Sequence, residues 1–355
     1  MKKISVPLLT VLFAYSGNLT YAQPLLKTEA PPQHQNKKQK TLKNGTPRKI
    51  EKSKVNIERG TYHGWKNTVR LSNGETELIF VPQIGRIMRY ATIGAPNLLW
   101  NNPALLGKTL DLAKPGTEWM NFGGDKLWPA PQSKWGWPPD PVMDAGTQEV
   151  KIKDGKILLV KGKISPKHAV QFTRAITMDT QGSTVTLVNT LTNVGKMEET
   201  WSCWEVAQMD DPDRMKTVLW KGGKNPKGYY DFPDAAPDEG LIKSDGEFLI
   251  LERSKTKSAK IGSDSPEGML ISEKGKRQFL MKMKVEAGKS YPDENSPLEI
   301  YTNPDPAAYV ELEMLSPLNK LKPGESVTFT VTWKIETLEK QPLSGDTPKK
   351  EGEKP

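Results

Sequence analysis

The chain has 355 residues, a formal net charge of +9 at pH 7 and a single cysteine, Cys203. One cysteine cannot form an intramolecular disulfide, so the fold must depend on its hydrophobic core. The length allows either one large all-β domain or two smaller domains.

Residues 1–22 have the features of a secretory signal peptide. Lysines at positions 2 and 3 precede an apolar run over residues 4–15, and a small-residue site ends at Ala22. The apolar run is too short to span a bilayer, and no later segment is comparable. We therefore expect a periplasmic or secreted protein without a membrane span.

Residues 23–54 form a basic, Gln- and Pro-containing leader. Its last part, residues 37–54, holds eight Lys or Arg side chains against one Glu, which accounts for most of the net charge. Because the basic surplus lies outside the body of the protein, a nucleic-acid partner is not predicted. A solvated, disordered tether is the simpler interpretation, and contact with an anionic envelope polymer is the alternative. Residues 339–355 are expected to form a disordered charged tail.

Residues 55–338 contain the turn signals that are typical of antiparallel strands. Asn-Gly at 73–74 and Asp-Gly at 154–155 each separate two strand-like runs, and Gln-Gly at 181–182 does so less strictly. After residue 324, apolar residues alternate with polar ones, as in a strand with one buried face. Convincing amphipathic helices are missing apart from a short one expected around 103–113. The fold class is therefore all-β, with two packed sheets.

The stretch 121–141, NFGGDKLWPAPQSKWGWPPDP, looks like a surface loop but is rich in tryptophan. Two interpretations stay open: the loop covers the core, or it forms the rim of a sugar-binding cleft. Sugars offer hydroxyls to charged and amide groups and C–H surfaces to aromatic rings. The side chains that would supply both kinds of contact are Asp125, Lys126, Trp128, Gln132, Trp135 and Trp137.

Few familiar catalytic or metal-binding motifs are present. The chain has three histidines, and His34 lies in the leader, so a zinc site is not expected. His168 is best explained as structural, whereas His63 is a candidate for the site. The acidic turn over 210–213 is more typical of a solvated turn than of a calcium site. We predict no metal and no cofactor.

Carboxylates are the more promising groups. Glu311 and Glu313 stand two positions apart in a strand-like run, so both point to the same face. If that face is a concave site, burial would raise the pKa of one of them and make it a general base. Glu205 lies in an apolar strand and needs a partner if it is buried, with Arg86 and Arg174 as candidates.

The order of motifs resembles the DUF4380 family of the galactose-mutarotase-like superfamily. The resemblance covers roughly residues 60–336, through ELIFVPQIGRIMRYATIGAPNLLW, FGGDKLWPAPQSKWGWPPDP, WSCWEVAQMD and YVELEMLSPLNKLKPGESVTFTVTWKI. GGDKLWPAPQ is the most specific element. The resemblance implies an antiparallel β-supersandwich with a concave, carbohydrate-facing surface.

In aldose 1-epimerases of this superfamily a late-strand Glu is the base, and it corresponds best to Glu313. Their general acid is a histidine, but here the equivalent strand reads WSCWEVAQ, with Trp204 or Glu205 in its place. The possible substitutes are Lys126, His63 and Glu205. Because this histidine is missing, the resemblance implies the fold more strongly than it implies the epimerase chemistry.

We therefore predict an exported carbohydrate-binding protein, with an aldose epimerase-like isomerase as the alternative and enzymatic activity left open. An acidic sugar would fit Arg86 and Lys126. The predicted catalytic residues are Glu313, Glu205, Lys126 and His63. The predicted substrate-binding residues are Arg86, Asp125, Lys126, Trp128, Gln132, Trp135, Trp137, Trp204 and Glu311.

Overall fold

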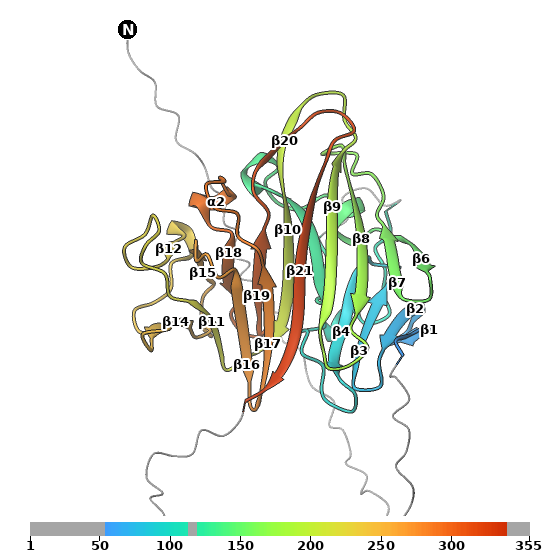
Figure 1. The fold of residues 1–355 in the computed structure, drawn as a ribbon, viewed down its shortest axis with the longest axis horizontal. Helices are drawn as coiled ribbons and strands as arrows, with labels where there is room; N and C mark the ends of the chain where they lie inside the picture. Colours follow the sequence, from blue (N-terminus) through green and yellow to red (C-terminus); the bar gives the residue numbers. More distant parts are fainter. Residues whose placement is uncertain (1–53, 113–118, 339–355) are drawn as a thin grey trace, which may run out of the picture. The chain divides into compact units, whose positions relative to one another are not determined.

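The computed structural model describes residues 54–112 and 119–338, which form three antiparallel sheets (Figure 1). The predicted signal peptide, most of the basic leader and the C-terminal tail lie outside the described residues. Within the described part of the chain, no helix is long and apolar enough to cross a membrane.

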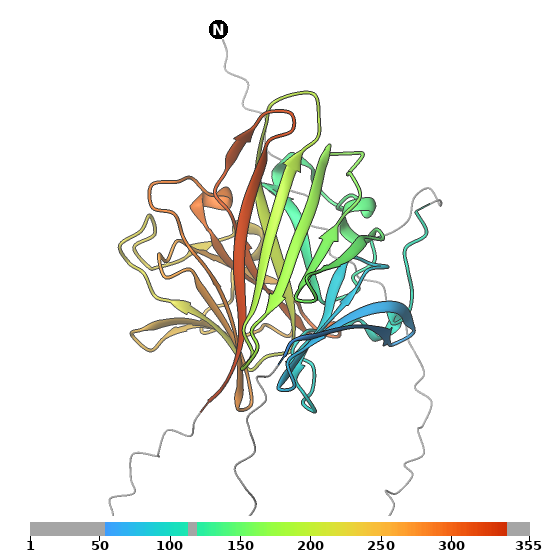
Figure 2. The ribbon, with the colours of Figure 1, turned by 45° about the vertical axis from the view of Figure 1, so that its right-hand side comes forward.

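The largest sheet has ten strands and contains the long strands β21, β9 and β8, which run side by side in Figures 1 and 2. Its order is β13 (Ile242–Ser244), β14 (Phe248–Leu251), β11 (Arg214–Val218), β16 (Met269–Lys274), β17 (Arg277–Met283), β21 (Ser326–Thr337), β9 (Val185–Asn193), β8 (Val170–Met178), β7 (Ile157–Lys161) and β6 (Glu149–Lys153).

The second sheet has seven strands and is centred on β10. Its order is β12 (Tyr230–Asp231), β15 (Ala259–Ser263), β18 (Leu298–Thr302), β19 (Tyr309–Leu315), β10 (Glu199–Asp210) and β20 (Asn319–Leu321), and β5 (Asp125–Ala130) also pairs with β10.

The third sheet has four strands, and the helical segments are short. The sheet order is β1 (Asn56–Tyr62), β2 (Trp65–Ser72), β3 (Thr76–Val81) and β4 (Arg86–Thr92). The short segments are the 3₁₀ turns η1 (Pro103–Leu105), η2 (Gln132–Lys134) and η3 (Pro233–Ala235), together with α1 (Pro141–Ala145) and α2 (Pro292–Asn295).

The turns at 73–74, 154–155 and 181–182 connect antiparallel pairs, as predicted. The alternation in β21 is also confirmed, because Val327, Phe329, Val331 and Trp333 are buried between more exposed residues. The helix expected over 103–113 was wrong in length. The only helical part of residues 103–112 is the three-residue turn η1, which is capped by Asn102. The backbone leaves the helical direction at Gly107, where φ is +72°.

The core lies between sheets, and its pattern follows from strand geometry. Strands β8 and β9 alternate strictly between buried and half-buried residues, so one face of each packs inward. Strand β10 is buried from Trp201 to Met209, on both of its faces. A single hydrophobic cluster includes Phe172 and Val331 of the ten-stranded sheet and Cys203 and Leu312 of the seven-stranded sheet. The same cluster also includes Trp204 and Val206 on the other face of β10, so apolar packing contributes to the burial of both faces of this strand.

Candidate functional site

Strand register gathers polar and aromatic side chains on one face of the seven-stranded sheet. Residues directly opposite one another in paired strands share a face, as do residues two apart in one strand. Lys126 and Glu313 both lie opposite Val206, and Tyr301 lies opposite Glu311. We call this surface the site face. It carries Lys126, Trp128, Trp204, Gln208, Lys260, Glu299, Tyr301, Glu311 and Glu313.

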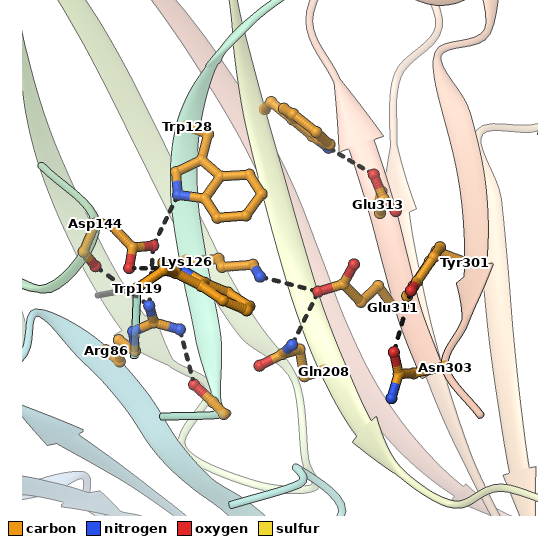
Figure 3. A network of polar contacts seen from close by, with 12 residues as sticks. Arg86, Trp119, Lys126, Trp128, Asp144, Gln208, Tyr301, Asn303, Glu311 and Glu313 are labelled. Atoms are coloured by element: carbon orange, nitrogen blue, oxygen red, sulfur yellow. Dashed lines mark hydrogen bonds and ion pairs between the residues drawn. The ribbon is translucent and has the colours of Figure 1, made fainter. Parts of the chain in front are cut away.

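Lys126 is the centre of the first polar group on the site face (Figure 3). Its Nζ lies 2.9 Å from Glu311 Oε1, which also accepts a hydrogen bond of 2.9 Å from Gln208 Nε2. The same ammonium lies 4.0 Å from the ring centroid of Trp128 and 5.4 Å from that of Trp119. Two indoles and a carboxylate thus compensate the desolvation of this buried lysine.

Asp144, at the end of α1, holds both indoles in place. The Trp128 indole N–H donates to Asp144 Oδ1 over 2.8 Å, and the Trp119 indole N–H donates to Oδ2 over 3.2 Å. Asp144 also forms an ion pair with Arg86, at 2.9 Å. Arg86 itself is fully buried and donates to the Gly123 carbonyl, so its charge supports Asp144.

Lys260 is the centre of a second group. Its Nζ lies 2.6 Å from Glu299 Oε2 and 3.0 Å from Glu313 Oε2. Glu313 also accepts a 2.9 Å hydrogen bond from the Trp204 indole. The rings of Trp204 and Phe232 lie 5.1 and 4.9 Å from the ammonium. Each of the two lysines is therefore placed between two aromatic rings and beside carboxylate.

Burial changes the acidity of this second group. It raises the pKa of Glu313 and raises that of Glu299 well above its usual range, and the charge of Lys260 opposes both shifts. Burial also opposes the charge on Lys260, but the neighbouring carboxylates outweigh it and raise the Lys260 pKa. Glu299 and Glu313 lie directly opposite one another, and like charges in that position repel. A proton on one of the pair relieves the repulsion.

The other face of β10 carries a separate polar network inside the sandwich. Arg174 of β8 lies 2.6 Å from Asp125 Oδ2 and 4.0 Å from Glu205 Oε1, which confirms Arg174 as a partner of Glu205. Asn189 donates a short hydrogen bond to Glu205. Asp125 also accepts from the backbone N–H of Ile87. Because side chains alternate along a strand, the structure places Asp125 and Glu205 away from Lys126 and Glu313.

The remaining predicted residues fall in several places. His63 lies in the turn between β1 and β2 of the four-stranded sheet, where its ring packs edge-on against Tyr62. Gln132 begins η2, beyond the end of β5. Trp135 and Trp137 both contact Trp128, and the side chain of Trp137 is 50% exposed. Trp137 is thus the open aromatic surface next to the Lys126 group.

The Trp-rich stretch is not a loop throughout. Residues 125–130 form the fully buried strand β5, which tolerates Pro129 because, among the described strands, it pairs with β10 alone. Gly123 and Gly124 have positive φ angles, and a Cβ there would lie 2.2 Å from the Trp100 carbonyl and 2.3 Å from the Ile87 carbonyl. Glycine is therefore required at both positions because the protein's own backbone approaches closely there.

Sequence reasoning missed several members of the site. These are Lys260, Glu299, Gln208, Tyr301, Trp119 and Asp144. The alternation in LEIYT, 298–302, could have placed Glu299 and Tyr301 on one face, and Gln208 follows Trp204 at even spacing. No local signal marks Asp144, which is brought in by tertiary packing.

The described residues contain no group of three or more His, Cys, Asp or Glu side chains that could hold a metal ion. In the acidic turn, Asp210 pairs with Lys274 and Asp211 with Arg253. Asp213 accepts the backbone N–H of Gly275.

The architecture is that of a mutarotase-like antiparallel sandwich with a polar, aromatic-lined sheet face. A galactose mutarotase-like protein from Lactobacillus casei has a TM-score of 0.54 at 8% identity, covering 76% of this chain and all of that one. A galactose mutarotase-like protein from Clostridium acetobutylicum has a TM-score of 0.50 at 12% identity, covering 80% of this chain and 99% of that one. These similarities show the fold.

The chain belongs to the family described as "Domain of unknown function (DUF4380)", whose model matches residues 67–336. No curated protein sequence matches it.

Proposed function

We propose that the protein is an exported carbohydrate-binding protein that holds a sugar on the site face. The observation that carries the proposal is the Lys126 group, in which an ammonium, a carboxylate and an amide lie beside the indoles of Trp119 and Trp128. The Glu311 side chain is 12% exposed, and Trp137 provides an open ring that packs against Trp119 and Trp128. Hydroxyl groups can bond to Glu311, while an aromatic ring can pack against sugar C–H groups.

The fold and the start of the chain support this proposal. Proteins named for galactose mutarotase share the architecture, and in this chain the site face belongs to the seven-stranded sheet of that sandwich. Export to the periplasm or the medium is inferred from residues 1–22. The basic leader would contact anionic envelope polymer.

A calorimetric screen of the full mature chain against mono- and oligosaccharides tests the proposal. We expect at least one sugar to bind, and Glu311→Gln to weaken binding about tenfold by removing a charged acceptor. Glu77→Gln is a matched control, since Glu77 is also ion-paired but belongs to the four-stranded sheet. Equal losses in both variants would point to general destabilisation and contradict the proposed site.

Glu313 and Glu299 favour a second candidate, an aldose epimerase-like isomerase. An ionised Glu313 could take the proton of an anomeric hydroxyl while a protonated Glu299 gives one to the ring oxygen, which opens the ring and allows it to close on either face. In this arrangement Glu299 would fill the role of the missing histidine. Burial and the repulsion between the two carboxyls raise their pKa values, which favours a proton on one of them, as acid–base catalysis requires.

Exchange NMR at the anomeric proton tests this second candidate on each sugar that binds. We expect Glu313→Gln and Glu299→Gln each to reduce the exchange rate by about 10²-fold or more. Binding without faster anomer exchange in the unmodified protein would show a binding protein without turnover for that sugar.

A further inference from the structure

The site face has more acceptors than free donors. Gln208 Oε1 and Glu299 Oε1 are buried and accept no hydrogen bond from the described residues. Gln208 is 0% exposed and Glu299 is 1% exposed. Buried acceptors without a donor are costly, and they indicate a missing partner that supplies N–H or O–H groups.

Both ammonium groups of this face are already engaged. Lys126 pairs with Glu311, and Lys260 is shared by Glu299 and Glu313. Neither lysine is therefore available to an anionic ligand without breaking an ion pair on the site face.

A strained turn before β18 carries a further carboxylate. In α2 the residues Asp293, Glu294 and Asn295 have φ angles of +50°, +57° and +70°, so this segment is a left-handed turn. Each such residue costs about 1–2 kcal/mol, and strain of this kind clusters at functional sites. Asp293 acts electrostatically on both Lys260 and Glu299. Two carboxyl groups thus contact the Lys260 ammonium, and a third acts on it electrostatically.

Aromatic surface lies at the same place. Phe232 and Trp204 flank the Lys260 ammonium, and Tyr230 packs against Phe232. Carboxylates combined with aromatic faces favour organic cations.

From these observations we propose that the sugar bound on the site face carries a protonated amino group, as in a hexosamine. Its ammonium would balance the surplus of carboxyl groups that act on Lys260 and donate to Glu299, while hydroxyl groups of the sugar would donate to Gln208. The inference rests on the proposed carbohydrate binding and names its ligand class. It is opposite in charge to the acidic sugar expected from Arg86 and Lys126, because both of those cations are neutralised by partners within the protein.

Sugars that differ in one substituent test the proposal by calorimetry on the full mature chain. In the gluco, galacto and manno series, the hexose is compared with its 2-amino, 2-acetamido and 6-carboxylate derivatives. We expect the 2-amino sugar of at least one series to bind about tenfold more tightly than the hexose and the acetamido sugar. The ratio of its affinity to that of the hexose should decrease at high salt, and the uronic acid should bind most weakly.

Asp293→Asn tests the role of the turn. Asparagine tolerates a left-handed backbone, so the turn should persist while its charge is lost. We expect the preference for the amino sugar over the hexose to fall about threefold. Asp154→Asn is a matched control, because Asp154 has a φ of +53° and lies in the β6–β7 hairpin of the ten-stranded sheet. It should leave the preference unchanged.

The outcomes separate the two proposals. If a hexose or a uronic acid binds as tightly as the amino sugar in every series that binds, the amino-sugar inference is overturned and carbohydrate binding stands. An equal effect of the Asp293 and Asp154 variants would also overturn it. If none of the sugars binds, carbohydrate binding itself fails, and the inference fails with it.

Discussion

The ammonium of Lys126 lies 2.9 Å from the carboxylate of Glu311, although the two residues are 185 positions apart in the sequence. They belong to β5 and β19, which lie on opposite sides of β10 in the same sheet. The pair therefore bridges over a central strand. Its existence depends on the register of both strands, so it reports on assembly of the whole site face.

A double-mutant cycle should show strong coupling between these two residues. Lys126→Met and Glu311→Gln remove the charges singly and together, and we expect a coupling free energy of about 2 kcal/mol from urea unfolding. The lysine side chain is 1% exposed, so solvent screens the pair weakly.

The ion pair between Lys243 and Glu252 provides the comparison. Its side chains are 55% and 41% exposed, and we expect a coupling below about 0.5 kcal/mol. Equal coupling energies for the two pairs would contradict the buried pairing on the site face.

Glu205 should make stability depend on pH. Burial raises its pKa from 4.5 to about 7, and the charge of Arg174 opposes the shift. Below about pH 4.5 the group is protonated in both the folded and the unfolded state. As the pH rises toward 7, the unfolded state releases the proton first, so the free energy of unfolding falls and then levels off above pH 7.

Glu205→Gln isolates this contribution. The free energy of unfolding of the unmodified protein, minus that of the variant, should decrease by about 3 kcal/mol between pH 4.5 and pH 8. Denaturant titrations at several pH values measure it. A difference that stays constant with pH would show that Glu205 binds protons equally in the folded and unfolded states, so that burial does not raise its pKa.

Gly123→Ala should be far more destabilising than a substitution at a comparable glycine. Gly123 and Gly74 have φ angles of +89° and +92°, but only at Gly123 would a Cβ meet the Trp100 carbonyl, at 2.2 Å. At Gly74 no atom lies within 4 Å. We expect Gly74→Ala to cost about 1 kcal/mol and Gly123→Ala at least about 3 kcal/mol in thermal or urea unfolding. Similar losses of stability in the two variants would mean that backbone strain, and not the contact with the Trp100 carbonyl, determines the effect of both substitutions.

The sequence predicts the fold well because strand signals are local. Asn-Gly and Asp-Gly turns and the alternation around Phe329 each act within a few residues, and the structure confirms them. The sites are harder to predict, since both β10 and β5 are buried on two faces. In such strands every residue looks like core, so alternation does not show which face Glu205 or Asp125 occupies.

The predicted pair Glu311 and Glu313 was found on one face because spacing of two is a local property. Their partners were not predictable in the same way. Lys260 reaches Glu313 only through the pairing of β15 with β18 and of β18 with β19. A contact that depends on the registers of two successive strand pairs cannot be predicted from a single sequence.

Asp144 should control the geometry of the Lys126 group without contacting the sugar. Its carboxylate accepts hydrogen bonds from the indoles of Trp119 and Trp128 and pairs with buried Arg86. Asp144→Asn keeps the size of the side chain but removes the charge, which leaves Arg86 without a compensating anion. We expect a loss of about 3 kcal/mol in the free energy of unfolding.

A positioning role requires more than lost stability. Trp119→Phe keeps the Asp144–Arg86 pair and removes a single indole hydrogen bond, so it should cost about 1 kcal/mol in stability. If Asp144 orients the rings, both variants should weaken sugar binding at temperatures where the protein remains folded, as measured by calorimetry. If Asp144 serves only the core, the affinity of folded Asp144→Asn will match that of the unmodified protein despite its lower stability. That result would confine the carboxylate to a structural role and leave Trp128 oriented by the packing of Trp135 and Trp204.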